Sequence, residues 1–112
     1  MQLTEEISGD LMILKVQDAR LDASKAPALR AALVERIARG NQSIILDLEA
    51  VEFMDSAAMS ALITAVKTLG PIGTISVASM RFAVARLFSV ARMDRVFPVN
   101  ATVDEAIQSL AA

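Results

Sequence analysis

The sequence predicts an α/β fold with a mixed, mostly parallel β-sheet of four to five strands and four helices, in the order β-β-α-β-α-β-α-β-α. Three observations lead to this prediction. The chain has 112 residues, 54% of them hydrophobic and 21% charged, which suits one ordinary domain. After two opening strand patterns, short apolar runs alternate with stretches of helical periodicity. No linker, repeat or low-complexity segment interrupts the pattern, so we expect residues 1–112 to form a single domain.

The first third of the chain predicts a β-hairpin followed by a helix. Leu3–Ile7 and Leu11–Val16 are rich in apolar residues and flank a Ser-Gly-Asp turn. A helix is expected from Ser24 to Arg39, with Ser24 as its N-cap and Gly40 just beyond its end. Its inward stripe recurs every fourth residue, at Leu29, Leu33 and Ile37.

The centre of the chain predicts a buried strand and a second helix. Ser43–Leu48 is a short apolar run of the kind found in central strands, and Val51–Met54 leads out of it. The helix is expected to begin at Ser56, with Asp55 as its N-cap, and to stop at Gly70. The apolar positions that predict its buried face are Met59, Leu62, Ile63, Val66 and Leu69.

The last third predicts strand, helix, strand and helix. Strands are expected at Thr74–Ala78 and Val96–Val99, with a helix over Arg81–Ala91 between them. Thr102 and Glu105 have the spacing of a capping box for the final helix. Right-handed crossovers are expected to place most helices on one face of the sheet. The residues expected to point inward are Val84, Leu87, Phe88 and Ala91 in the third helix and Val103, Ala106, Ile107 and Leu110 in the fourth.

The composition disfavours most catalytic chemistry. The sequence has no His, Cys, Trp or Tyr, which excludes a disulfide, a thiolate zinc site and a Ser-His-Asp triad. Carboxylate chemistry stays open, for instance at a site shared by Asp22 and Asp55. The favoured interpretation is a binding or regulatory module, so we assign no catalytic residue, metal ligand or cofactor.

The charge distribution bears on the partners. A net charge of -2 disfavours nucleic acid as a partner. No apolar run approaches the ~18 residues that a membrane helix needs, and the N-terminus lacks the pattern of a secretion signal, so we expect no membrane insertion. Residues 1–55 hold ten acids and six bases, whereas residues 56–112 hold three acids and five bases. The late arginines form either a solvated helix face or a basic patch for an acidic partner or phosphate: Arg81, Arg86, Arg92 and Arg95.

Asp55 and Ser56 are the residues with the most chemical content. They lie where a strand leads into a helix, so Ser56 falls in the first helical turn with an accessible hydroxyl. A phosphate on that hydroxyl would meet helix N–H donors, but it would also lie beside the Asp55 carboxylate. The alternative is that this Asp-Ser pair only caps the helix.

At this point the sequence resembles a known family. The stretch from Leu46 to Ser56, LDLEAVEFMDS, is similar to the core of STAS domains, above all the anti-sigma factor antagonists of bacteria. Their signature runs from an Asp-Leu strand end through an apolar pair into Asp-Ser-Ser/Thr-Gly-Leu/Met. The similarity extends over nearly the whole chain and includes Leu21-Asp22, Ala26-Pro27, Leu29-Arg30, Arg86-Leu87-Phe88, Asp94-Arg95-Val96-Phe97 and Asp104-Glu105-Ala106.

The resemblance implies a function. It implies a cytoplasmic regulator of transcription that binds an anti-sigma factor, itself a serine kinase of the histidine-kinase-like ATPase type. The kinase would phosphorylate Ser56 and release the antagonist, and a serine phosphatase would restore it. Asp55 matches the Asp of the motif, and Asp22 matches an acidic loop residue near the phosphoacceptor.

Three departures from the family pattern leave an alternative open. Ala57 and Ala58 stand where Ser or Thr and then Gly are usual, and Arg92 stands where many members have Gly. The Ala58 methyl lies where a kinase would need close backbone approach. The alternative is a constitutive STAS adaptor without a phospho-switch, for example in a lipid-transport ATPase complex.

The contact surface is expected around the start of the second helix. Met54 and Ala57 are expected to be exposed apolar contacts there, although filling of the core is the other interpretation for Met54, Met59 and Met80. The residues expected to surround the phosphosite and bind the partner are Asp22, Met54, Asp55, Ala57, Ala58 and Met59.

Overall fold

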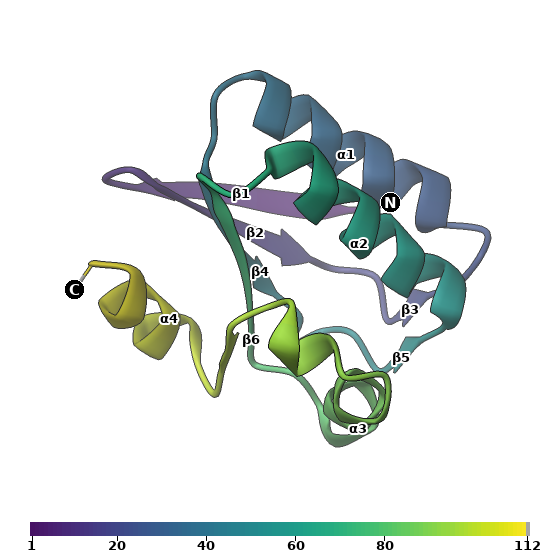
Figure 1. Ribbon diagram of the computed structural model, residues 1–112. Helices are drawn as coiled ribbons and strands as arrows, with labels where there is room; N and C mark the ends of the chain where they lie inside the picture. Colours follow the sequence, from purple (N-terminus) through teal and green to yellow (C-terminus); the bar gives the residue numbers. More distant parts are fainter. Residues whose placement is uncertain (112) are drawn as a thin grey trace.

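The computed structural model, which describes residues 1–111, has a five-stranded sheet with helices on both faces (Figure 1). The hairpin strands β1 and β2 pair antiparallel, and every other pairing in this sheet is parallel. This architecture confirms the predicted fold class. The strands lie in the order β1 (Leu3–Ser8), β2 (Leu11–Val16), β4 (Ser43–Asp47), β6 (Thr74–Ala78) and β7 (Val99–Asn100).

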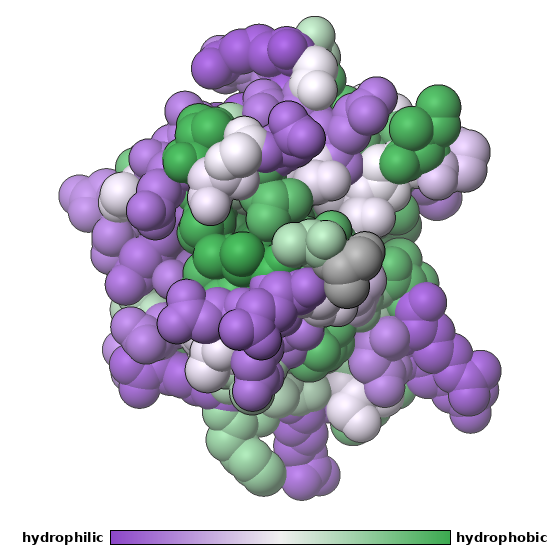
Figure 2. All heavy atoms as spheres, turned by 90° about the vertical axis from the view of Figure 1, so that its left-hand side faces the viewer, coloured by the Kyte–Doolittle hydropathy of each residue, from purple (hydrophilic) through white to green (hydrophobic). Residues whose placement is uncertain are grey.

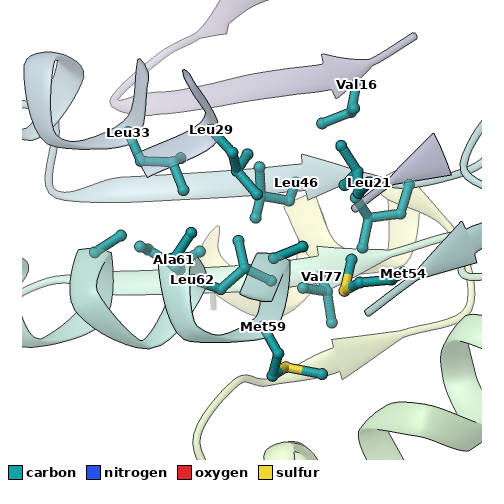
Figure 3. Packing of buried hydrophobic residues seen from close by; sticks show 14 of the residues in the cluster. Val16, Leu21, Leu29, Leu33, Leu46, Met54, Met59, Ala61, Leu62 and Val77 are labelled. Atoms are coloured by element: carbon teal, nitrogen blue, oxygen red, sulfur yellow. The ribbon is translucent and has the colours of Figure 1, made fainter. Parts of the chain in front are cut away.

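Three helices cover one face of this sheet, which we call the front face. They are α1 (Ala26–Ala38), α2 (Ser56–Leu69) and α3 (Phe82–Val90). Their apolar sides pack on alternate residues of β2, β4 and β6, including Leu14, Leu46 and Val77, to form the main core (Figure 3). Most helices therefore lie on one face, as the handedness of the crossovers predicts.

The back face is covered by α4 (Val103–Ala111) alone (Figure 1). A smaller cluster joins Ala106 of α4 to Leu11, Ile13, Ile45 and Ala78 of the sheet. The space-filling view from the left-hand side of Figure 1 shows apolar residues gathered in a hollow between polar ones (Figure 2). This one helix and the sheet leave Leu11, Ile13, Ile45 and Ala78 at most 9% exposed.

A second, two-stranded sheet was not predicted. β3 (Arg20–Leu21) and β5 (Phe53–Met54) pair in parallel, with Leu21 opposite Met54. Two-residue strands carry no periodicity, so the sequence gives no local sign of them. This pairing brings Asp22 and Asp55, the residues that follow the two strands, to the same edge.

The expected start of α1 is wrong. The helix begins at Ala26 with Lys25 as N-cap, and Ser24 lies outside it. The Ser24 hydroxyl and backbone N–H both donate to Oδ1 of Asp22 instead. These two bonds fold Asp22–Ser24 into an Asx-type turn, which holds Ser24 outside the helix.

The strand expected at Val96–Val99 is also wrong in its bounds. A 3₁₀ turn over Met93–Arg95 follows α3, and β7 begins only at Val99. Phe97 is fully buried between them and packs edge-on against Phe88, with ring centroids 5.8 Å apart. Burial of the Phe97 ring in the core therefore outweighs strand pairing before Val99. Ala91, expected to point inward, is exposed because α3 ends before it.

The cap of α4 follows the prediction in its main part. The backbone N–H of Glu105 donates to Oγ1 of Thr102 at 3.1 Å. The Glu105 carboxylate accepts from the N–H of Ala101, at 3.3 Å, one residue before the position that a capping box uses. Of the four residues expected to be buried, Ala106 is fully buried and Val103, Ile107 and Leu110 are half-buried.

Candidate functional site

The candidate site lies at the carboxyl end of the small sheet. The loop after β3 and the start of α2 meet there, because parallel strands end at the same edge. Ser56 is the first residue of α2, and its side chain is exposed. Asp22 and Asp55 lie on the two segments that meet. The structure therefore gathers the sequence-predicted polar residues into one region.

Asp55 joins the two segments through both of its carboxylate oxygens. Oδ1 accepts the N–H groups of Ala57 and Ala58 at 3.0 and 3.1 Å, which confirms Asp55 as the N-cap of α2. Oδ2 accepts the N–H of Ala23, in the neighbouring loop, at 2.9 Å. The Asp55 N–H in turn donates to the carbonyl of Leu21 at 3.1 Å. One side chain thus fixes the β3–α1 loop against the helix that carries Ser56.

This arrangement changes the expected surroundings of a phosphate. The helix N–H groups of Ala57 and Ala58 are already occupied by Asp55. A phosphate on Ser56 would therefore have to displace the Asp55 carboxylate to accept from these two N–H groups. A phosphate would lie beside the Asp55 carboxylate and in water.

Asp22 differs from Asp55 in its contacts. Its side chain is about one-third exposed, and Oδ2 lies 3.9 Å from Nε of Arg20. The hydrogen bond from the Ser24 hydroxyl, with the nearby charges of Lys25 and Arg20, holds the pKa of Asp22 below its usual range. Asp22 is therefore ionised near neutral pH and partly available to a partner. Asp22 and Asp55 accept from separate donors and share none, and this geometry does not favour a shared acid–base site.

The comparisons with known proteins fit this geometry. Residues 2–106 match the family model of the STAS domain. The chain belongs to the STAS domain family. Its structure is similar to that of an anti-sigma factor antagonist from Mycobacterium paratuberculosis, at 25% identity and a TM-score of 0.90, covering 99% of this chain and 94% of that one.

Three further solved structures, of two proteins, are similar. The anti-sigma factor antagonist SpoIIAA, a Bacillus cell fate determinant, matches in its unphosphorylated form at 20% identity, with a TM-score of 0.73 and 99% of each chain covered. Its phosphorylated form matches at 20% identity and a TM-score of 0.72, covering 97% of this chain and 99% of that one. The murine anion transporter Slc26a9 matches over 92% of this chain but 18% of its own, at 20% identity and a TM-score of 0.74.

Three of the residues expected to surround the phosphosite of this STAS domain and bind the partner are buried. Met54 and Met59 are 6% and 5% exposed and belong to the main core (Figure 3), and Ala58 is fully buried. The expectation that Met54 is an exposed contact is therefore wrong, and the core interpretation holds for both methionines. Met80 is half-buried and packs against the same core. The buried Ala58 methyl does not project into the approach to Ser56.

The remaining departures from the family pattern also have a structural account. Ala57 is half-buried and lines a shallow cleft of about 270 Å³ between the first turns of α1 and α2, beside Ser56. Arg92 adopts the left-handed conformation, with φ +58°, after α3. Glycine fits this conformation without strain, which accounts physically for a glycine at this position in other STAS domains.

Sequence reasoning missed two participants in the site. Ala23 contributes a backbone N–H, and Ser24 contributes its hydroxyl and N–H to Asp22. Every residue except proline has a backbone N–H, so the sequence does not indicate that Ala23 donates to Asp55. Ser24 had a signal in the sequence, since a serine two residues after an aspartate is typical of an Asx turn.

The described part of the chain, residues 1–111, holds no helix with the length and apolar character needed to cross a membrane.

Proposed function

We propose that this STAS domain is a bacterial anti-sigma factor antagonist, a protein-binding regulator rather than an enzyme. In its unphosphorylated form it binds an anti-sigma factor that is a serine kinase of the histidine-kinase-like ATPase type. Phosphorylation at Ser56 ends the binding, and a serine phosphatase restores it. The observation that carries the proposal is an exposed hydroxyl on the first turn of α2, placed by Asp55 beside the partly exposed Asp22. The protein needs no cofactor and works in the cytoplasm.

Electrostatics explain how such a switch would act. A phosphoserine adds about -1.5 to -2 charge at neutral pH. Because Asp55 already uses the N–H groups of Ala57 and Ala58, the new charge gains no helix donors there and is repelled by Asp55. A partner that covers Ser56 would have to dehydrate this charge. We expect a coupling of roughly 1–3 kcal/mol, which weakens the partner's binding about 5- to 150-fold.

The first experiment identifies the phosphorylated residue. The protein is incubated with its captured kinase and ATP, and intact mass reports the number of phosphates. We expect one phosphate on the wild type and none on Ser56→Ala. Ser60→Ala is the matched control, because Ser60 is an exposed serine one turn later on the same helix and its variant should still accept one phosphate. An unmodified wild type, or a modified Ser56→Ala, contradicts the proposal.

The alternative is a constitutive STAS adaptor, for example a subunit of a lipid-transport ATPase complex. It is favoured by the occupied helix N-terminus, where Asp55 fulfils a purely structural role. The two functions differ in the response to charge at position 56. If Ser56→Asp binds the partner as tightly as Ser56→Ala, the adaptor function is supported. If only Ser56→Asp loses binding, the switch is supported.

A further inference from the structure

An apolar groove lies between β5 and α3, next to the candidate site. It has a volume of about 330 Å³, and we call it the α3 groove; its lining residues are Phe53, Met54, Ala83, Arg86, Leu87 and Val90. Met54 is the residue before Asp55, so the groove adjoins the surface that presents Ser56. The groove could not be predicted from the sequence, because no strand was expected to pair at Phe53–Met54.

The walls of the α3 groove expose large apolar side chains. Phe53 is 39% exposed and Val90 is 73% exposed; Phe82, which precedes the lining residue Ala83 and is not itself part of the lining, is 79% exposed. Each Å² of apolar surface left in water forgoes roughly 25 cal/mol of stabilisation. Several such residues around one concave feature are typical of a binding surface rather than of scattered exposure.

The rim of the groove is basic, although the whole chain has a net charge of -2. Arg86 is part of the lining, and the guanidinium carbon of Arg20 lies 4.1 Å from the centre of the Phe53 ring. Residues 81–95 contain four arginines and one acidic residue, Asp94. The acidic residue next to Phe53 in the sequence is Glu52. Two arginines thus lie at the groove, Arg86 of α3 and Arg20 of the small sheet.

We propose that the α3 groove docks a segment of a partner protein that inserts a bulky apolar side chain and places carboxylates against Arg20 and Arg86. The charge of the rim favours an acidic segment. Its concave shape favours an inserted side chain over a membrane, which takes apolar groups that project. The docking rests on the proposed function only in that the same partner reaches both Ser56 and the groove. It would give that partner a second contact that phosphorylation does not touch.

The test uses two synthetic amphipathic peptides with the same leucine and phenylalanine positions, one flanked by glutamates and the other by lysines. Binding is followed by amide chemical shifts of the isotopically labelled protein. We expect the glutamate peptide to shift the amides of Phe53, Ala83, Leu87 and Val90, more weakly as salt is added, and the lysine peptide to bind at least about tenfold more weakly. Equal binding of both peptides, shifts elsewhere, or no binding overturns the proposal.

Two exposed positions provide matched variants. Val90→Glu adds a charge in the groove, and we expect it to weaken the glutamate peptide at least about tenfold, or about 1.4 kcal/mol. Ile72→Glu adds the same charge at an apolar residue that is 80% exposed in the α2–β6 loop, and it should leave binding unchanged. Both side chains are exposed, so both variants should fold. An unaffected Val90→Glu, or an equal loss in both variants, refutes groove docking.

Three further measurements distinguish this proposal from binding of a membrane or a second copy of the chain, and from the phospho-switch. Ser56→Asp should bind the glutamate peptide like the wild type, so a failed switch and a failed groove give different results. Anionic vesicles should not protect Val90 from exchange or shift it. Sedimentation should not show a dimer that Val90→Glu abolishes. A positive vesicle result assigns the groove to a membrane, a Val90-dependent dimer assigns it to a second copy of the chain, and either one overturns the proposal.

Discussion

The two faces of the sheet differ in how they are covered, and the difference locates the function. The front face is buried under three helices, and its core includes Leu21, Met54 and Met59, which lie around the candidate site (Figures 1 and 3). The back face carries only α4 and a small cluster (Figure 1). Packing of the front face therefore positions the Ser56 surface, whereas the back face contributes stability without touching the site.

The largest expected effect comes from a matched pair of leucine truncations. Leu46→Ala removes a fully buried side chain of β4 from the front core and should cost about 2–5 kcal/mol in the free energy of unfolding. Leu110→Ala removes a half-buried side chain of α4 and should cost about 1 kcal/mol. Urea unfolding measures both. Equal losses would show that the back face is as tightly packed as the front.

The next effect tests whether Asp55 positions the site. Asp55→Ala removes the cap of α2 and the bond to Ala23, and we expect it to cost about 2 kcal/mol, near the upper end of the range for a cap. The amide signals of Ala23 and Ser56 should broaden or shift in the same variant. Asp22→Ala is the control, because the side-chain contacts of Asp22 are local, and it should destabilise the protein clearly less than Asp55→Ala.

A partial rescue separates charge from geometry at this position. Asp55→Asn keeps one side-chain oxygen that can accept the helix N–H groups, so it should recover roughly half of the loss. If Asp22→Ala is as destabilising as Asp55→Ala, the assignment of Asp55 as the positioning carboxylate is wrong.

Strong local signals account for the parts of the fold that the sequence predicts well. The strand Thr74–Ala78 is β-branched and bounded by glycine, and the start of α2 has an aspartate directly before a helical apolar stripe. Both are encoded within a few neighbouring residues. The predicted phosphoacceptor position depends on the second of these signals, so its place on the first turn of α2 could be read from the sequence.

The parts that could not be predicted depend on contacts between distant residues. The β3–β5 pairing joins Leu21 to Met54, and neither two-residue strand has a period of its own. The bond from Ala23 to Asp55 depends on that pairing. Burial of Met54 follows from it as well, because the small sheet directs that side chain into the core. A single sequence encodes such contacts only in the context of the complete fold.

A smaller effect is expected on the back face. The hydroxyl of Ser76 is fully buried, and within residues 1–111 it has no hydrogen-bond partner; its neighbour across the strands is Ile45. Ser76→Ala removes an unsatisfied polar atom and should stabilise the protein by about 1 kcal/mol. Ser89→Ala, at an exposed serine of α3, should change stability by less than about 0.5 kcal/mol. A destabilised Ser76→Ala would show that the hydroxyl is satisfied in solution.

The smallest effect is a pH dependence at the edge of the front face. The backbone N–H of Gln2, with a further contribution from Lys25, lowers the pKa of Asp18 below its ordinary value of 3.8. Because the folded pKa lies below the unfolded one, Asp18 stabilises the fold above about pH 4, and this contribution is lost as the pH falls through the folded pKa. The bonds tie the start of β1 to the residue that caps α1, so the loss should loosen the front layer. In Asp18→Asn, the free energy of unfolding should fall less steeply with acidification, by less than about 1 kcal/mol in total. Asp10→Asn, in the exposed hairpin turn, should leave this pH dependence unchanged. Acid profiles of Asp18→Asn and the wild type that coincide would remove Asp18 from the contacts that hold the front face together.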